Sequence, residues 1–360
     1  MLTILGGGMA GLVAAARARE LGLEPVVHER GMRPGGSMLL SSCVIWRYRS
    51  AARFAGECPG GDPALQALVV ERLDDAIAWL ESLGAEPVWQ ETGNPRTVGK
   101  RFDPARLTEL LVRAAGDVRL GSRPSDNLLL AGSGPLLLAT GGFQGSRELI
   151  ERYIRPAAPL RLRANPWSAG DGLRLGLERG ARLSSGLDEF YGRNMPDADF
   201  AEPEFVPLAQ LYGRFARVFD EDGVEFFPGE PSWSEVDLVQ ETARRPGARA
   251  WYVLDEAALS QKVRDRTVAE MAAAATTRLD PAGLPFPAPP GSVLAVRVAA
   301  SITHTVGGLA VDTRARTGVD GLWAAGADAG GIATGGYCSG LASALVLGLA
   351  AAEDAAATSK

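Results

Sequence analysis

The sequence is poor in the residues that hold metals and disulfides. Its 360 residues include three cysteines and two histidines, His28 and His304. The cysteines, at positions 43, 58 and 338, follow no metal-ligand spacing and suggest no disulfide framework. The sequence therefore predicts no metal site, and its cysteine usage suits a reducing cytoplasm, where we expect the protein to be.

Two further absences limit the partners. Lys and Arg do not outnumber Asp and Glu, and the formal net charge of −6 leaves no surplus of cations for binding nucleic acid. No apolar run approaches the roughly 20 residues of a membrane span, and the apolar stretch Leu341–Ala352 is better explained as a buried helix. No basic segment of a signal peptide precedes the first apolar run. We therefore expect the protein not to bind nucleic acid and not to contain a membrane-spanning segment.

The start of the chain carries the most informative pattern. Leu2–Leu5 predicts a short buried strand, a glycine-rich turn follows, and an Ala-rich helix continues to about Leu21. A second apolar run ends at Glu29. This order of strand, turn, helix, strand and acid is typical of a dinucleotide-binding unit.

Each residue of that unit has a separate physical role. Gly6 allows the tight turn, Gly8 lets a pyrophosphate approach the backbone, and Gly11 lets the helix pack closely on the strand. The amides at the helix start attract phosphate, and Glu29 can accept both ribose hydroxyls. The motif by itself leaves open which dinucleotide binds.

The rest of the chain predicts an α/β domain that is interrupted by a smaller one. Residues 1–186 and 295–360 read as the dinucleotide-binding domain, and residues 187–294, which are richer in aromatics and prolines, as an inserted α+β domain. Further helices are predicted over residues 63–84, 104–115, 147–154, 170–180 and 341–352, and further strands over 136–138, 214–218, 224–227, 293–298, 309–311 and 322–326.

Several glycine-rich motifs in a fixed order resemble one family. In chain order they are Gly6–Glu29, Gly35–Ser37 with Ser41 and Ser42, 79–84, 139–143, 170–172, 305–312 and 321–326. Together they resemble a compact member of the FAD-binding type 2 superfamily, which includes fumarate reductases, tricarballylate dehydrogenases and 3-ketosteroid dehydrogenases. The resemblance implies FAD as the cofactor. It also implies a Rossmann-like, glutathione reductase-like FAD-binding domain with an inserted capping domain.

The resemblance also implies a set of FAD contacts. Ser41 and Ser42 would lie along the ribityl chain or the flavin edge, and the first amides of the last helix would point at the flavin N1 and C2 carbonyl. Relatives carry Glu at position 327, whereas here Ala327 is followed by Asp328, whose carboxylate we consider for the ribityl hydroxyls. The candidate cofactor residues are Gly6, Gly8, Met9, Ala10, Gly11, Glu29, Arg30, Gly36, Ser37, Ser41, Ser42, Val118, Thr140, Gly141, Gly142, Asp171, Gly326, Asp328, Leu341 and Ala342.

Two residues are candidates for catalysis. His304 stands in a segment similar to the one whose histidine holds a substrate carboxylate in fumarate reductases, and we expect it to donate a hydrogen bond to a substrate oxygen. Tyr337 occupies the place of the carboxylate-clamping arginine of those enzymes and resembles the tyrosine that polarises the substrate carbonyl in ketosteroid dehydrogenases. The proton-donating arginine of the cap is also missing near Trp233. A fumarate-like diacid is therefore disfavoured.

The resemblance implies hydride transfer between flavin N5 and a carbon–carbon bond next to a carbonyl of a small-molecule substrate. Since no second nucleotide-binding motif is seen, the electron acceptor would be external: a quinone, a carrier or dioxygen. Two alternatives stay open, a flavin oxidase of an amine or alcohol and a non-catalytic FAD-containing interaction subunit. Arg193 and Arg214 are further candidates for cations that face the flavin from the cap.

Overall fold

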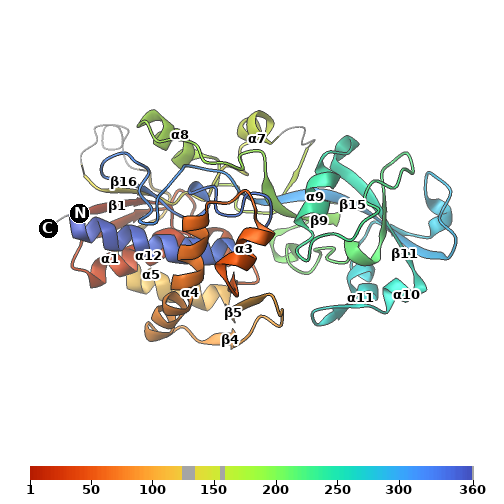
Figure 1. The fold of residues 1–360 in the computed structure, drawn as a ribbon, viewed down its shortest axis with the longest axis horizontal. Helices are drawn as coiled ribbons and strands as arrows, with labels where there is room; N and C mark the ends of the chain where they lie inside the picture. The colour runs from red at the N-terminus through yellow and green to blue at the C-terminus, as the bar shows by residue number, and fades with distance from the viewer. Residues whose placement is uncertain (124–133, 155–158, 359–360) are drawn as a thin grey trace. The chain divides into compact units, whose positions relative to one another are not determined.

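The computed structural model describes residues 1–123, 134–154 and 159–358, and the chain forms two compact units (Figure 1). The first unit joins both ends of the chain: Met1–Leu149, Ala164–Glu189 and His304–Lys360. The second unit consists of Ile150–Arg163 and Phe190–Thr303.

The first unit is built on a parallel five-stranded sheet in the order β16-β7-β1-β2-β6. The central strand β1 pairs with β2 on one side and with β7 on the other, so the winding of the chain reverses there. Open α/β sheets bind ligands at the carboxyl ends of the strands beside such a reversal. This sheet confirms the predicted α/β class. Its strands are β1 (Leu2–Leu5), β2 (Pro25–His28), β6 (Val118–Arg119), β7 (Leu136–Leu138) and β16 (Leu322–Ala324).

Small residues let the helices of this unit pack tightly. Helix α1 (Met9–Glu20) contacts α5 (Pro104–Ala115) and α12 (Gly340–Thr358), and Figure 1 shows these helices on one side of β1 with α8 (Asp171–Glu178) on the other. A β-carbon at Gly348 of α12 would stand 2.7 Å from the carbonyl oxygen of Ala10 in α1. The remaining helices are α2 (Gly36–Leu39), α3 (Ala51–Glu57), α4 (Pro63–Ser82) and α7 (Arg147–Tyr153), whose last residues belong to the second unit.

Helix α12 is longer than expected. It continues to Thr358, six residues beyond the predicted end at Ala352, because the alanine-rich sequence contains no helix breaker. It is the one helix in the described part of the chain that is long and apolar enough to cross a membrane. Of its most apolar window, 78% is buried inside the structure, as in the core helix of a globular protein.

A small antiparallel sheet in the first unit was not predicted. Its order is β3-β5-β4, and β3 leads from the predicted serine contacts toward α3. The strands are β3 (Val44–Tyr48), β4 (Pro87–Trp89) and β5 (Thr97–Phe102).

The second unit has the predicted α+β character. Its sheet runs β10-β11-β15-β14, and β8 and β9 also pair with the long strand β15. Buried residues such as Tyr252 and Val298 form its core. Its strands are β8 (Arg161–Leu162), β9 (Phe190–Pro196), β10 (Arg217–Phe219), β11 (Arg249–Asp255), β12 (Lys262–Val263), β13 (Arg266–Thr267), β14 (Arg278–Leu279) and β15 (Ser292–Thr305); its other helices are α9 (Val236–Ala243), α10 (Glu256–Leu259), α11 (Val268–Ala273) and the 3-10 turns Glu202–Glu204, Gly213–Phe215, Pro246–Ala248 and Pro281–Gly283.

Two predicted strands are wrong. Leu309 makes only isolated bridges, to Leu183 and Ala329, so residues 309–311 form no strand. Residues 224–227 follow the predicted turn but contribute a single bridge, Phe219 to Glu225. In addition, the domain boundary expected at residues 294/295 falls inside β15, which continues without a break.

Candidate functional site

The turn between β1 and α1 requires two of its glycines for packing within the protein. Gly6 has φ +107°, and a β-carbon there would stand 2.0 Å from the carbonyl oxygen of Ala139. A β-carbon at Gly11 would stand 1.9 Å from the carbonyl oxygen of Gly6. Only glycine fits either position, because any larger residue would push α1 or β7 away from β1.

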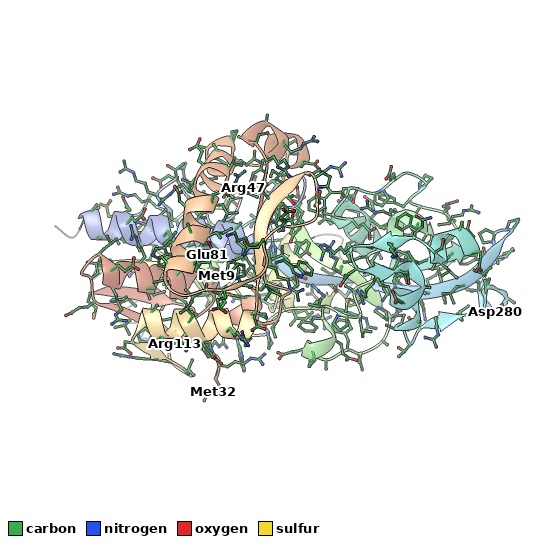
Figure 2. The ribbon with its side chains drawn as sticks, turned by 90° about the horizontal axis from the view of Figure 1, so that it is seen from below. Met9, Met32, Arg47, Glu81, Arg113 and Asp280 are labelled. Atoms are coloured by element: carbon green, nitrogen blue, oxygen red, sulfur yellow. The ribbon has the colours of Figure 1, made fainter. Side chains whose placement is uncertain are left out.

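Gly8 is different, since a β-carbon there would meet no protein atom within 4 Å. Its φ of −85° and ψ of −169° are open to any residue. The turn of Gly36 lies opposite: the Gly35 amide donates to the Gly7 carbonyl at 2.7 Å, and a β-carbon at Gly36 would stand 3.3 Å from Gly8 Cα. Open space thus lies beside the start of α1. Met9, labelled in Figure 2, is the first residue of this helix and is buried.

This space fits the pyrophosphate of a dinucleotide. The amides at the start of α1 carry the partial positive charge of a helix N-terminus, and the facing glycine turns leave no side chain to hinder an anion. Ala10 and Met9 form the first turn of α1, and Ser37 lies in the first turn of α2. The structure therefore brings these predicted phosphate contacts together at one edge of the sheet.

Glu29 lies just beyond the end of β2 and is fixed by the backbone. Its Oε2 accepts from the Gly7 amide and its Oε1 from the Gly31 amide, each at 2.7 Å. A carboxylate oxygen can accept more than one bond, so both can still receive ribose hydroxyls. Arg30 donates to Asp171 of α8 at 3.0 Å. Both residues are among the predicted cofactor contacts, so this ion pair brings two of them together.

Asp328 has a role that sequence analysis did not foresee. It is 1% exposed and lies in a 3-10 turn, η5 (Gly326–Asp328). Its carboxylate accepts from the Thr140 amide at 2.5 Å, from the Thr140 hydroxyl and from the Gly142 amide at 3.0 Å. The Thr140 hydroxyl oxygen in turn accepts from the Gly172 amide at 3.0 Å. One carboxylate therefore holds together three motifs, whereas the ribityl contact proposed for it stays a prediction.

Burial dominates the electrostatics of this carboxylate. It raises the pKa of Asp328, while the hydrogen bonds from Gly142 and Thr140 act in the opposite direction. A raised pKa means that the folded protein holds this proton at a higher pH than the unfolded chain does. As pH rises above 3.8 toward the folded-state pKa, the carboxyl therefore loses stabilising effect, and above that pKa its contribution is constant.

The predicted serine contacts lie between α2 and β3. The Ser41 hydroxyl donates to the Met38 carbonyl at 2.8 Å and accepts from the Cys43 amide at 3.0 Å. The Ser42 carbonyl accepts from Arg101 at 3.1 Å. Burial raises the pKa of Cys43 to about 12, so it is a neutral, space-filling thiol.

The start of α12 is capped by a serine. The Ala342 amide donates to the Ser339 carbonyl at 3.0 Å and lies 3.3 Å from the Ser339 hydroxyl oxygen. The Ser339 hydroxyl donates to the Val44 carbonyl of β3 at 3.3 Å. Gly326 lies nearby, with φ +67° and its β-carbon position 3.3 Å from Ala10 Cβ. The flavin contacts of Leu341 and Ala342 stay predictions, and in this structure Ser339 already uses the Ala342 amide.

Tyr337 is held by aromatic residues that precede it by nearly 300 positions. The Tyr48 hydroxyl donates to the Tyr337 carbonyl at 2.7 Å. The Trp46 ring meets the Tyr337 ring edge-on, with centroids 5.5 Å apart and an interplanar angle of 67°. Trp46 and Tyr48 also pack edge-on at 5.3 Å. Tyr337 as a whole is partly exposed, and its backbone carbonyl is fixed by Tyr48.

The other two cysteines are inert under ordinary conditions. Cys58 and Cys338 are buried and free, and burial raises the pKa of Cys338 to about 12 and that of Cys58 further. A thiol with so high a pKa is not a nucleophile near neutral pH. This supports the interpretation of Cys338 as a space-filling neighbour of Tyr337.

His304 contacts the backbone of the residue that follows it. Its Nδ1 lies 3.1 Å from the carbonyl oxygen of Thr305, and since a carbonyl oxygen only accepts, Nδ1 carries the proton. Burial lowers the pKa of His304, so the ring is neutral at pH 7. Its Nε2, which lies 3.1 Å from the β-carbon position of Gly340, then holds a lone pair. In this tautomer Nε2 can accept a proton or a hydrogen bond, whereas the hydrogen bond expected from His304 to a substrate oxygen stays a prediction.

The two arginines considered for the cap belong to a network inside the second unit. Arg193 donates to the Ser234 carbonyl, and Arg214 donates to the Trp233 carbonyl at 2.8 Å and contacts Glu235 at 3.4 Å. Burial raises the pKa of Glu235, while the two guanidinium groups lower it. These contacts give both arginines a structural role in their own unit.

Comparison with protein families identifies the cofactor. A family model described as an FAD binding domain matches residues 107–341, which is more than half of the chain. The chain belongs to this FAD binding domain family. A second model, the NAD(P)-binding Rossmann-like domain, matches residues 4–42, the β1–α1–β2 unit that carries the open pyrophosphate space. The first motif did not indicate which dinucleotide binds, and the family now identifies it as FAD.

Individual relatives agree with the family. A probable fumarate reductase, Ifc3 of Shewanella frigidimarina (strain NCIMB 400), is 23% identical over 422 aligned positions, which span 91% of this chain and 70% of the relative. A flavocytochrome c3 fumarate reductase in its open conformation has a TM-score of 0.72 at 20% identity and spans 99% of this chain and 78% of its own. The 3-ketosteroid Δ1-dehydrogenase of Sterolibacterium denitrificans has a TM-score of 0.74 at 14% identity, with 99% of each chain covered.

These findings confirm the predicted fold class, FAD and the superfamily. This FAD-dependent oxidoreductase belongs with the fumarate reductases and ketosteroid dehydrogenases, whereas the individual contacts predicted for the cofactor and the substrate are untested. Trp46 and the donor–acceptor state of His304 were missed. Nothing in the sequence indicated the contact of Trp46 with Tyr337, because it joins distant segments. The tautomer of His304 depends on the local geometry of its contact with the neighbouring Thr305, which the sequence does not specify.

Proposed function

We propose that this oxidoreductase transfers a hydride between FAD and a carbon–carbon bond next to a carbonyl group. The observation that carries the proposal is Tyr337, a partly exposed tyrosine fixed by Tyr48 and Trp46 at the start of α12. A phenol in this place can donate one hydrogen bond to a carbonyl oxygen, whereas a carboxylate clamp needs a bidentate cation. A ketone or enone substrate therefore suits the site better than a diacid.

Different residues of the chain would bind the cofactor, polarise the substrate carbonyl and transfer the proton. Bound FAD would supply the hydride acceptor or donor at N5, held along Gly8, Gly36 and Glu29. The Tyr337 hydroxyl would donate to the substrate carbonyl and so stabilise the negative charge that develops on its oxygen. His304 Nε2, with its lone pair, would take the proton from the neighbouring carbon in the oxidative direction and return it in the reductive direction.

The two compact units suggest a division of roles as well. We propose that the first unit is the FAD-binding domain and the second the substrate or capping domain. The flavin would be reoxidised by an external acceptor, which would be a quinone, a protein carrier or dioxygen. We also propose that the protein is cytoplasmic. The flavocytochrome named among the similar structures makes a carrier a reasonable choice.

Anaerobic mixing tests the reaction class. The purified holoenzyme is mixed with saturated ketones, with dicarboxylates, and with amines or alcohols, and the flavin absorbance is followed. We expect ketones to bleach the oxidised flavin and the matching enones to restore the colour of the reduced flavin. Bleaching by dicarboxylates alone contradicts the carbonyl proposal. Bleaching by amines or alcohols with peroxide release on aeration supports the oxidase, and no response to any compound supports the interaction subunit.

The pH profile tests the role of His304. Because burial lowers its pKa below 6.5, the ring loses its lone pair only in more acid solution. The rate of flavin bleaching should therefore be constant above pH 6.5 and fall tenfold per pH unit below the lowered pKa, and His304→Gln should remove this acid limb. A limb that persists in His304→Gln would assign the titration to another group.

A further inference from the structure

Trp167 is a half-exposed aromatic residue next to the ribose carboxylate. Its exposed fraction is 46%, and it lies on the segment that leads into α8. A β-carbon at Gly31 would stand 2.9 Å from both Cδ1 and Nε1 of the indole and 3.1 Å from Glu29 Oε1. One edge of the indole therefore lies over a residue without a side chain, within a few ångströms of the carboxylate.

The backbone around Trp167 is fixed. The Trp167 amide donates to Asn165 Oδ1 at 2.9 Å, and the Ala169 amide donates to the Trp167 carbonyl at 2.9 Å. Ser168 is buried, and its hydroxyl oxygen lies 2.7 Å from the β-carbon position of Gly141. The indole is thus carried by an ordered segment that is anchored to the glycine turn after β7.

The surroundings indicate which part of FAD would meet the ring. Glu29 is the residue predicted to hold the adenosine ribose, and its carboxylate is bound by the Gly7 and Gly31 amides. The base attached to that ribose would then lie beyond the carboxylate, away from the pyrophosphate space at Gly8. The ion pair Arg30–Asp171 joins the residue after Glu29 to the first residue of α8, the helix that follows the Trp167 segment. A flat indole with an uncovered portion suits a flat heteroaromatic base, because aromatic rings stack on bases by contact between their faces.

We propose that Trp167 stacks on the adenine ring of FAD and is the residue that makes the chain retain FAD in preference to flavins without an adenosine half. Trp167 takes no part in the reaction at Tyr337, so this role stands or falls separately from the proposed function. Gly31 supports the stack by leaving room for the indole.

Cofactor binding to the full chain tests the proposal. FAD is removed, and FAD, ADP and FMN are titrated into the wild type and into Trp167→Ala, Trp167→Phe and Met32→Ala. Met32 is the matched control, since it is a neighbouring apolar residue that is 76% exposed and projects from the surface (Figure 2). We expect Trp167→Ala to weaken FAD and ADP by about 5- to 100-fold. Trp167→Phe should restore most of the affinity, and FMN should bind all variants equally.

Two outcomes would overturn the proposal. Unchanged binding of FAD and ADP excludes stacking, and equal weakening of FMN shows that Trp167 only supports the fold. A second measurement remains informative even if Trp167→Ala does not fold: ADP should quench indole fluorescence in the wild type and quench it much less in Trp167→Phe. Equal quenching in both proteins contradicts the stack.

Discussion

Gly8→Val should abolish FAD retention and leave the protein folded. The backbone at Gly8 is extended, and a β-carbon there meets no protein atom within 4 Å, so the folded protein has room for valine. The same side chain would occupy the space beside the α1 amides. Losing two or more charge-assisted hydrogen bonds to phosphate costs about 3 kcal/mol or more, which is roughly 100-fold or more in affinity. Flavin absorbance of the purified protein measures the loss.

Gly229→Val is the matched control for this experiment. Gly229 lies in the second unit, has no strained backbone, and likewise has no atom within 4 Å of its β-carbon position. It should keep its colour and its unfolding midpoint. A Gly8→Val protein that is folded and fully loaded with FAD would exclude the pyrophosphate from this turn. By contrast, Gly6→Val should fail to fold, because Ala139 occupies the space.

Tyr337→Phe should slow flavin bleaching by ketones by about 100-fold, the usual effect of removing one donor to a developing oxyanion. The Trp46 and Tyr48 contacts use the ring and the backbone of Tyr337, so phenylalanine should keep the same place. FAD content and substrate affinity should change little. Rapid-mixing absorbance on the loaded variant separates the rate constant from binding.

Tyr153→Phe serves as the control for the removal of a tyrosine hydroxyl group. Tyr153 lies on α7 under the guanidinium of Arg152, 5.2 Å from its ring centroid, and has no predicted role in catalysis. It should bleach at the wild-type rate. An unchanged rate in Tyr337→Phe would remove Tyr337 from the reaction, and loss of FAD from that variant would instead make it a cofactor contact.

The helices with clear start signals were predictable from sequence. An aspartate followed by proline begins both α4 and α5: Asp62 and Asp103 accept from the first amides, and the proline takes the first position of the helix. The strand at Leu309 was misread because three apolar residues also occur in a buried loop. Leu309 instead makes isolated bridges to Leu183 and Ala329, and these residues come near Leu309 only when the chain folds.

The candidate site shows the same limit. Gly11 and Glu29 could be assigned because their contacts with Gly6 and Gly7 lie within the first 30 residues. The tight turn of Gly6 could be assigned too, whereas its close approach to Ala139 could not. The partners of Asp328 and the tautomer of His304 could not, since each depends on a contact whose geometry the spacing does not encode. Trp167 was passed over for a related reason: a single tryptophan in a loop carries no periodic signal.

The bond between Thr140 and Asp328 has a consequence for how the protein is made. The two residues are 188 positions apart, so a ribosome synthesises the hydroxyl and amide donors long before their acceptor. Strand β16, which completes the sheet, and helix α12, which contacts α1, are also synthesised long after Thr140. FAD would therefore be captured only after the ribosome has synthesised α12, and a nascent chain that stalls in the second unit would stay colourless.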